Sequence, residues 1–524
     1  MRPKLDQHLD YFIVAALVAL CYILFIHDLG GIGFLGPDEP RYAGVAREMY
    51  QSGDFITPRL GGETWFEKPV LMYWLAAIAY AVFGVGEAAA RLPSALGASL
   101  SIFLIYWCGR RVFSRGVGFA AAVILATSVG FFALARAASM DMLLTTALTG
   151  ALACFLVAMV TEGPRRRWYF YGFYAALGFA VLAKGPIGIL LPVLALGLFM
   201  LWRGTPWDWK RWHPEGVLVT ALVAGPWYTA VTWVNGREFF DVFILNHNLE
   251  RFTSEVHGHP QPFYFYAPVL LLLLFPWTFV LFPALRRRYT RSEQLTLLWA
   301  VVPLIFFSLS GSKLPAYILP VLPPLALLGA REIVRNEVTT AYRVGVLVQA
   351  AFWVVVGVAL GFFGDTLNID FEIGPFAALV PALALAGLLV AVAVWFPPPA
   401  LGTFNAVSMS IVVLAITIAV FPRVQSLESM RPWEGELDQF VEAGDSVVLY
   451  KPDRWMEYGL QYYREAAPRV ALSAEELAML TRNGDRLFCI AENHLLDELS
   501  ADQTVLIEVV SSVGDQSAFW AWQP

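Results

Sequence analysis

Asp38 and Glu39 form a pair of adjacent carboxylates in the segment GPDEPRY, directly after the first long apolar run of the chain. The Gly-Pro dipeptide before them interrupts a helix, so the pair is expected at the end of that run, beside Arg41 and Tyr42. Adjacent charges next to a bilayer are costly unless solvated or paired, so they indicate a functional site more often than a solvated loop. Such a carboxylate could deprotonate an attacking group or stabilise positive charge on a sugar ring.

Glu67 and Lys68 place a carboxylate and an ammonium side by side among aromatic residues in WFEKPVLMYW. Lys68 could supply a point charge to a phosphate, and Glu67 could hold a divalent cation. The alternative is an aromatic belt at a membrane interface with a snorkelling lysine. The residues alone leave both interpretations open.

Three further segments carry side chains that could contribute to the same site. Asp141 follows Arg136 in ARAASMDM, where a structural Arg–Asp pair at a helical hairpin competes with a functional role. Lys313 and Tyr317 occur in SGSKLPAY, and Lys184 occurs in LAKGP. Each lysine is either a snorkelling anchor or part of a pocket that receives lipid phosphates.

His247 and Arg251 in NHNLERF are four residues apart, so on a helix they share one face and could address one ligand together. His257 and His259 follow in HGHPQPF. One imidazole with a distant carboxylate is a weak metal signal, far short of a ligand cluster.

The elements that position these residues belong to a membrane protein. Of the 524 residues, 58% are hydrophobic and 15% charged, and the mean hydropathy is +0.60. Soluble proteins carry about 25% charged residues. The four cysteines show no paired spacing, so neither a disulfide framework nor a Cys/His zinc motif is expected.

Apolar segments of roughly the length that crosses a bilayer recur along the chain, and they predict an α-helical polytopic fold with about thirteen transmembrane helices. The shorter segment 70–84 suits a juxtamembrane or re-entrant helix. The predicted spans lie near residues 11–27, 87–108, 117–135, 142–160, 168–183, 187–202, 217–234, 264–283, 294–309, 314–330, 342–363, 376–396 and 403–421.

The basic clusters predict the orientation. With the N-terminus in the cytoplasm, the clusters beginning at Arg110, Arg165, Arg286 and Arg331 all fall on the cytoplasmic side, as the positive-inside rule requires. Loops 28–86 and 235–263, which carry most of the candidate residues, then face the periplasm. An odd number of spans also places the C-terminus there.

The composition becomes that of a soluble domain near residue 424. Four segments resemble strands (DSVVLYK, PRVALS, RLFCIAE and TVLIEVV), and they alternate with helix-like segments such as YGLQYYRE. We therefore predict a transmembrane domain over 1–423 and a small periplasmic α/β domain over 424–524. This domain contains no spacing typical of a catalytic site, so a structural or substrate-orienting role is favoured.

The order of the motifs resembles that of the ArnT-like bacterial glycosyltransferases, which have a GT-C fold and are related to protein O-mannosyltransferases. The best-known member transfers aminoarabinose to lipid A. The resemblance runs through about residue 330, and later regions agree only in architecture. It rests on DEPRYAGVARE, FEKPVLMYW, AARLPSALGA, ARAASMDMLL, LAKGP, GPWY, HNLERF, HPQPFYFY and SGSKLPAYILP.

The resemblance implies an inner-membrane transferase that takes a sugar from undecaprenyl phosphate at the periplasmic face, without a nucleotide cofactor. The acceptor would be lipid A or another envelope molecule. It implies catalytic roles for Asp38 and Asp141, a divalent metal such as zinc on Glu67 and His247, and substrate binding by Glu39, Arg41, Tyr42, Lys68, Arg251, Lys313 and Tyr317.

Several motifs depart from the family pattern. EKPVL stands where EKPPL is usual, GSKL stands where GKL is usual, and Asn246 precedes His247 where an acid is expected. These changes bear on the sugar and acceptor more than on the reaction class. A hexose or galacturonate donor and a protein or glycan acceptor therefore stay open. A secondary transporter fits less well, because the charges lie at helix ends rather than at the midplane and no internal repeat is evident.

Overall fold

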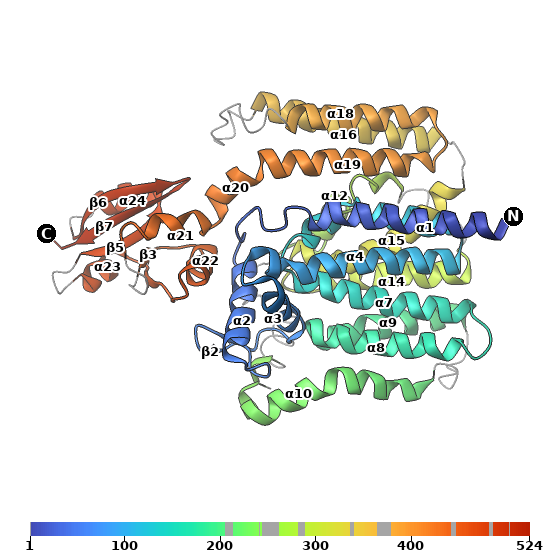
Figure 1. Cartoon of the computed structure of the whole chain (residues 1–524), viewed down its shortest axis with the longest axis horizontal. Helices are drawn as coiled ribbons and strands as arrows, with labels where there is room; N and C mark the ends of the chain where they lie inside the picture. Colours follow the sequence, from blue (N-terminus) through green and yellow to red (C-terminus); the bar gives the residue numbers. More distant parts are fainter. Residues whose placement is uncertain are drawn as a thin grey trace. The chain divides into compact units, whose positions relative to one another are not determined.

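The structure is a computed structural model that describes residues 2–523, except 205–212, 240, 244–260, 281–288, 336–339, 364–378, 442–446, 482–485 and 502–503 (Figure 1). The chain forms two compact units. The helical unit comprises Met1–His27, Phe66–Leu75 and Arg91–Ala415, and the mixed unit comprises Asp28–Trp65, Ala76–Ala90 and Ile416–Pro524.

Helices dominate the first 440 residues, and every apolar segment predicted from the sequence contains helical residues. The α-helices there are α1 (Arg2–Cys21), α2 (Asp38–Ser52), α3 (Leu71–Phe83), α4 (Glu87–Val112), α5 (Arg115–Ala126), α6 (Val129–Ala135), α7 (Met140–Val160), α8 (Arg166–Lys184), α9 (Ile187–Arg203), α10 (Val217–Phe239), α12 (Tyr266–Leu273), α14 (Arg291–Ser308), α15 (Leu322–Val334), α16 (Thr340–Phe363), α18 (Leu379–Val392), α19 (Ala400–Ala419), α20 (Phe421–Glu428) and α21 (Arg431–Leu437).

Short π and 3-10 segments interrupt or extend these helices. They are η1 (Tyr22–Ile26), η3 (Pro214–Gly216), η5 (Thr278–Val280), η6 (Pro315–Val321) and η8 (Ala393–Trp395).

Six helical stretches among the described residues are long and apolar enough to cross a membrane, and a bent pair adds a seventh if it counts as one span. Shorter apolar helices include α3, α9, α16 and α18, so the multi-span helical character is clear. The six stretches are His8–Ile26, Glu87–Val112, Met140–Val160, Pro214–Phe239, Pro315–Val334 and Ala400–Ile418.

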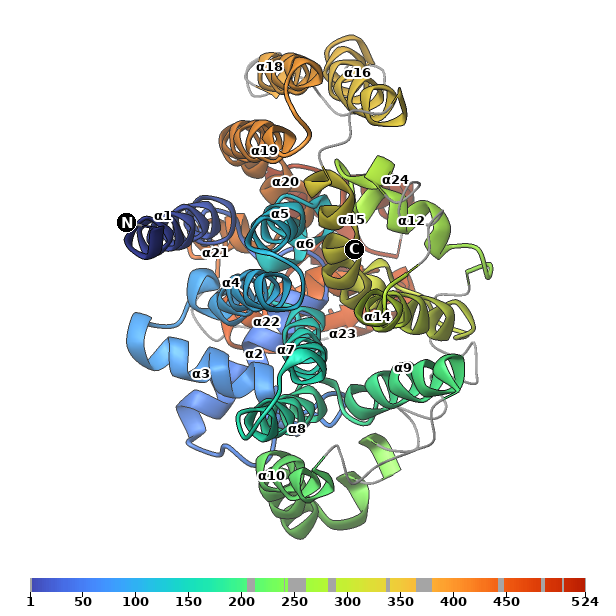
Figure 2. The same cartoon turned by 90° about the vertical axis from the view of Figure 1, so that its right-hand side faces the viewer.

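Within the helical unit, α7 packs on α8 and α8 on α9, as the end-on view shows (Figure 2). At the α4–α5 hairpin the backbones approach so closely that a Cβ built on Gly109 would lie 2.6 Å from the Gly118 Cα atom. Small residues permit such contacts between apolar helices. Next to this hairpin, Asp10 of α1 forms ion pairs of 2.7 Å with Arg110 and 3.0 Å with Arg115.

The predicted span 117–135 is bent, because α5 and α6 meet at an angle of 66°. The hydroxyls of Thr127 and Ser128 donate to the carbonyls of Val123 and Ile124, at 2.6 and 2.7 Å. Such back-bonding gives the backbone an alternative to continuing the helix.

The predicted span 264–283 is also not one helix within the described residues. α12 ends at Leu273, because Pro276 lacks an amide hydrogen and disfavours helical geometry in the residue before it. Two hydrogen bonds join the interrupted segments. The Val129 amide donates to the Phe275 carbonyl at 2.8 Å, and Trp277 Nε1 donates to Thr127 Oγ1 at 2.8 Å. Irregular backbone at membrane depth needs such partners from neighbouring protein segments.

The C-terminal part of the mixed unit is a five-stranded sheet with strand order β4-β3-β5-β7-β6. β3 pairs in parallel with β4 and β5, whereas β7 pairs antiparallel with β5 and β6. The strands are β3 (Val448–Tyr450), β4 (Arg469–Ala471), β5 (Leu487–Glu492), β6 (Leu506–Val513) and β7 (Gln516–Trp522), and the helices are α22 (Arg454–Arg464), α23 (Ala474–Leu480) and α24 (Asn493–Ala501). The four segments predicted as strands contain β3, β4, β5 and the first five residues of β6, and β7 lies outside them.

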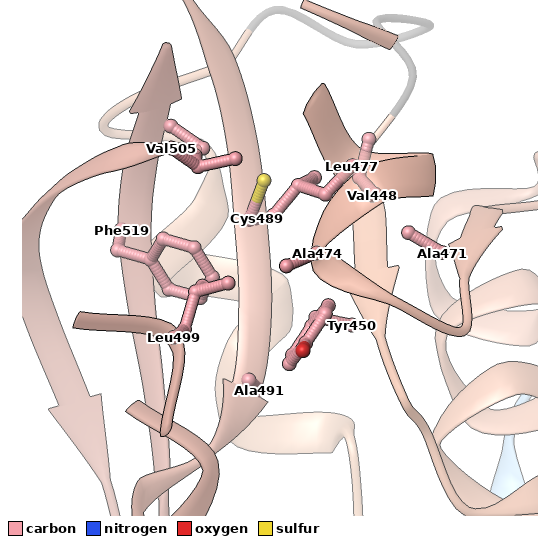
Figure 3. Close-up of a cluster of buried hydrophobic side chains, with 11 residues drawn as sticks. Val448, Tyr450, Ala471, Ala474, Leu477, Cys489, Ala491, Leu499, Val505 and Phe519 are labelled. Carbon is pink, nitrogen blue, oxygen red and sulfur yellow. The ribbon is translucent and has the colours of Figure 1, made fainter. Parts of the chain in front are cut away.

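Buried side chains lie on both faces of this sheet around β3, β5 and β7, since successive residues of a strand point to opposite sides. On one face, Tyr450, Cys489 and Phe519 pack with side chains from α23 and α24 (Figure 3). On the other, Leu449 and Ile490 pack with side chains that include those of α21 and α22. The sheet therefore has helices on both faces. The mixed unit also contains a small hairpin of β1 (Arg59–Leu60) and β2 (Glu63–Thr64).

Candidate functional site

In the mixed unit, Asp38 and Glu39 form the first turn of α2, where carboxylates are favoured by the helix dipole. The chain enters this helix through Gly36, whose φ of +61° is unfavourable for other residues. Glu39 is buried, and its Oε2 atom accepts from the Leu35 amide at 2.9 Å. Asp38 forms an ion pair with Arg41 and is 51% exposed, whereas the Arg41 side chain is only 8% exposed. A buried cation thus holds an accessible carboxylate.

Three aromatic rings surround the Arg41 guanidinium. Its Cζ atom lies 5.5 Å from the ring centroid of Tyr42, 5.5 Å from that of Trp65 and 5.4 Å from that of Tyr458. These distances fall within the range of cation–π attraction. Trp65 follows the β1–β2 hairpin and Tyr458 belongs to α22, and their rings meet edge to face at 6.3 Å. Tyr458 was not predicted from the sequence; its only signal there is the cluster of tyrosines in YGLQYYRE.

α22 also holds the segment around α2 at other points. The Phe34 amide donates to Tyr463 Oη at 3.0 Å. Arg47 donates to the Tyr462 carbonyl at 2.7 Å and pairs with Glu465 at 3.3 Å. The region of α22 therefore contacts the segment that carries Asp38 at Phe34, before α2, and at Arg41 and Arg47 within α2.

In the helical unit, Asp141 at the start of α7 forms an ion pair with Lys184 at the end of α8. Their side chains are 17% and 15% exposed. The Lys184 ammonium also lies 4.3 Å from the ring centroid of Tyr317 in η6. The structure thus brings two predicted residues, Asp141 and Tyr317, together around a lysine that the sequence indicates only as an anchor or a phosphate ligand.

Asp141, considered from the sequence as a partner of Arg136, pairs with Lys184. The Arg136 guanidinium donates to the carbonyl of His27 at 2.7 Å and to that of Leu24 at 3.4 Å. These carbonyls lie at the end of the first helical stretch, where backbone acceptors have no partner within the helix. Arg136 therefore closes that helix end.

Lys313 is buried, and its ammonium donates to the carbonyls of Ser310 at 2.6 Å and Gln261 at 2.9 Å. The Tyr266 hydroxyl donates to the neighbouring Leu314 carbonyl at 3.1 Å. These bonds order the turn that leads into η6 and Tyr317. The predicted substrate-binding role of Lys313 stays a prediction, and two of its three ammonium protons face backbone oxygens.

Glu67 and Lys68 are both partly buried, between the buried residues Phe66 and Pro69. The Phe66 ring packs edge to face on Phe239 at 5.4 Å. His247 and Arg251, with Asn246, His257 and His259, lie outside the described residues. Within the part of the chain that is described, no group of three or more His, Cys, Asp or Glu residues could hold a metal ion.

These features define a class: a helical membrane protein with acids and lysines at helix ends and an α/β C-terminal domain. The fold of this chain is similar to that of a solved structure, ArnT from Cupriavidus metallidurans bound to undecaprenyl phosphate, with a TM-score of 0.80 and 24% identity, covering 97% of each chain. Residues 67–229 match the family model for dolichyl-phosphate-mannose-protein mannosyltransferase.

Curated relatives narrow the class. The chain is 33% identical over 331 residues to the undecaprenyl phosphate-alpha-4-amino-4-deoxy-L-arabinose arabinosyl transferase 1 of Pseudomonas fluorescens, covering 62% of this chain and 58% of that protein. It is 32% identical over 360 residues to the corresponding transferase of Shewanella sediminis, covering 66% and 65%. The aligned part thus spans less than two thirds of each relative. The resemblance to ArnT-like glycosyltransferases is confirmed.

Proposed function

We propose that this protein is a glycosyltransferase that moves a sugar from undecaprenyl phosphate to an acceptor at the periplasmic face of the bacterial inner membrane. The leading substrates are 4-amino-4-deoxy-L-arabinose as the sugar and lipid A as the acceptor. The observation that carries this proposal is the similarity to aminoarabinosyl transferases over more than 60% of the chain. The acids and lysines at the helix ends supply chemistry that suits it.

The proposed topology has about thirteen spans, a cytoplasmic N-terminus and a periplasmic C-terminal domain. The ion pairs of Asp10 with Arg110 and Arg115 support a shared side for the start of α1 and the α4–α5 turn. Arg110 and Arg115 belong to the first basic cluster, which is expected in the cytoplasm. The loops that carry Asp38 and Asp141 would then both face the periplasm.

In the transfer step, the bond between the anomeric carbon and the phosphate oxygen breaks, and its electron pair leaves with undecaprenyl phosphate. An acceptor oxygen forms the new bond to that carbon. Lys68 and Arg251 would stabilise the charge on the leaving phosphate, since fixed cations act strongly in a water-poor site. Tyr317 would also contact this phosphate.

The acceptor decides the role of Asp38. A phosphate acceptor has an ionised oxygen, so no proton must be removed and Asp38 would position the reacting groups. A hydroxyl acceptor would pass its proton to the Asp38 carboxylate. The exposure of that carboxylate and its pairing with the buried Arg41 are compatible with either role.

Binding of a divalent metal by Glu67 and His247 stays a prediction. These two side chains supply fewer ligands than the four of a typical zinc site, so no step is assigned to a metal. Bound there, an ion would act as a Lewis acid toward phosphate. Elemental analysis of the purified protein, with Glu67→Gln and His247→Ala variants, tests the prediction: it requires a bound metal that both variants lose.

The decisive experiment is transfer by the purified protein in detergent from undecaprenyl phosphate-linked aminoarabinose to lipid A, followed by mass spectrometry. Asp38→Asn and Lys68→Ala should lower the rate at least about 100-fold, as loss of a residue that acts in the transition state does. Arg486→Ala, which removes an exposed pair with Glu508, is the matched control.

Donors carrying a hexose or galacturonate, and protein or glycan acceptors, belong in the same assay because they define the alternative specificities. Lipid A from a deletion strain provides an independent check: loss of the aminoarabinose mass supports the leading substrates, and unchanged lipid A excludes them. Failure of transfer from every donor to every acceptor would refute the transferase assignment.

A further inference from the structure

The C-terminal domain contributes one ring to the surroundings of the predicted catalytic acid. Tyr458 of α22 lies with its ring centroid 5.4 Å from Arg41 Cζ, and Arg41 in turn pairs with Asp38. All three residues belong to the mixed unit. The chain of contacts therefore runs from the α/β domain through one guanidinium to the exposed carboxylate.

Two features make this arrangement specific. The rings of Trp65 and Tyr458 contact each other at 6.3 Å with an interplanar angle of 76°, so together they limit the positions open to the guanidinium. The Arg41 side chain is only 8% exposed, and this burial strengthens its attraction to aromatic faces. A flexible arginine would leave the Asp38 carboxylate free to change rotamer, whereas a confined one holds it.

α22 is itself anchored on both sides. Met456 and Leu460 pack into the core beside the sheet, and the neighbouring Tyr462 carbonyl accepts from Arg47 of α2 at 2.7 Å. Tyr458 thus projects from a helix that is fixed to the sheet and to α2. Its ring also lies 5.7 Å from Arg454 Cζ, so a second cation contributes to its environment.

From these contacts we propose that Tyr458 and Trp65 are positioning residues for the transfer reaction: they confine Arg41 and thereby fix the Asp38 carboxylate, which makes the C-terminal domain part of the catalytic apparatus. The inference rests on the proposed glycosyltransferase function. Neither aromatic residue is expected to touch the sugar or its carrier, so both act through Arg41.

A graded substitution at position 458 separates positioning from simple packing. Phenylalanine and its mono-, di- and trifluorinated forms have nearly the same size, but each fluorine weakens the negative face of the ring that attracts a cation. We expect Tyr458→Phe to retain nearly wild-type kcat. The trifluorinated ring should lower kcat by about three- to tenfold, with little change in KM for the lipid-linked donor or in the melting temperature.

Substitution by leucine supplies the extreme of the series, with a loss in kcat of about tenfold or more. Trp522→Leu is the matched control, because Trp522 forms a comparable stack with Arg486 at 4.5 Å in the same domain. It should leave kcat unchanged. Equal kcat across the fluorinated series, or a decrease that follows melting temperature instead of ring electrostatics, would overturn the positioning role.

A thermal double-mutant cycle of Arg41→Gln and Tyr458→Leu is independent of catalysis. If the double variant loses less thermal stability than the sum of the two single variants, the Arg41–Tyr458 contact is supported. Losses of stability that simply add would contradict it. A wild-type protein that transfers no sugar but shows this coupling would refute the proposed function, and with it the catalytic consequence, while leaving the contact supported. A protein that transfers sugar normally without coupling would refute the inference alone.

Discussion

Asp141 and Lys184 form an ion pair that joins the start of α7 to the end of α8, with both side chains more than four-fifths buried. Removing either partner leaves a poorly solvated charge behind, whereas removing both leaves none. We therefore expect Lys184→Met alone to reduce the free energy of unfolding by about 2–4 kcal/mol. Asp141→Asn with Lys184→Met should cost clearly less than the sum of the two single changes.

Thermal unfolding in detergent measures this cycle, and Lys451→Met provides its control because Lys451 pairs with Glu498 at an exposed surface. Strict additivity of the Asp141 and Lys184 variants would contradict the buried pair. The single variants Asp141→Asn and Lys184→Met should each lose transfer activity, since the pair lies beside Tyr317.

The hydrogen bond from Trp277 to Thr127 joins the two interrupted helical segments of the helical unit. Thr127→Val removes the acceptor and leaves a buried indole N–H without it, which should cost about 1–3 kcal/mol. Trp277→Phe in the Thr127→Val background should then cost less than in the wild type. Thr161→Val, which affects only a bond to the Val157 carbonyl within its own helix, is the comparison. Equal effects of Thr127→Val and Thr161→Val on the melting temperature would argue against the link.

Glu492 provides a pH-dependent test of the C-terminal domain. Burial, assisted by the nearby Asp453 carboxylate, raises the pKa of Glu492, and His494 partly opposes the shift. Because the folded pKa exceeds the unfolded one, the stabilising contribution of the protonated carboxyl is present below the unfolded pKa and is lost as the pH rises through the folded pKa. Glu492→Gln should therefore match the wild-type melting temperature near pH 4 and exceed it at pH 7. An increase of the same size at both pH values would disprove the linkage.

Cys489 lies in β5 with no exposed surface, within the cluster of buried side chains drawn in Figure 3. Burial raises the pKa of its thiol well above the ordinary value, and the thiolate is the reactive form. In a variant that retains only this cysteine, a maleimide reagent should leave the folded protein unlabelled at pH 7.5 and label it after denaturation. Rapid labelling of the folded protein, measured by mass shift, would show that this core is open.

Much of the architecture was predictable because it depends on local composition. Apolar runs specify membrane helices, since a bilayer admits few other structures. Successive buried residues of β3 and β5 alternate between the two faces of the sheet, as the two-residue period of a strand requires. β7 escaped prediction because its recognition depends on the antiparallel partner β5, which lies earlier in the chain. The helix breaks near Thr127 and Pro276 were not predicted from the sequence, because the hydrogen bonds that stabilise them join segments distant in sequence.

The sequence by itself determined the class of protein and the candidate acids, because motif order and residue type are properties of the linear chain. Asp38, Arg41 and Asp141 are recognisable as candidates from their motifs alone. Which residue pairs with which was decided by the tertiary structure. Lys184 reaches Asp141 only because α7 packs on α8, and Tyr458 reaches Arg41 only because α22 packs on α2. Such contacts depend on folding in three dimensions, so no spacing in the sequence records them.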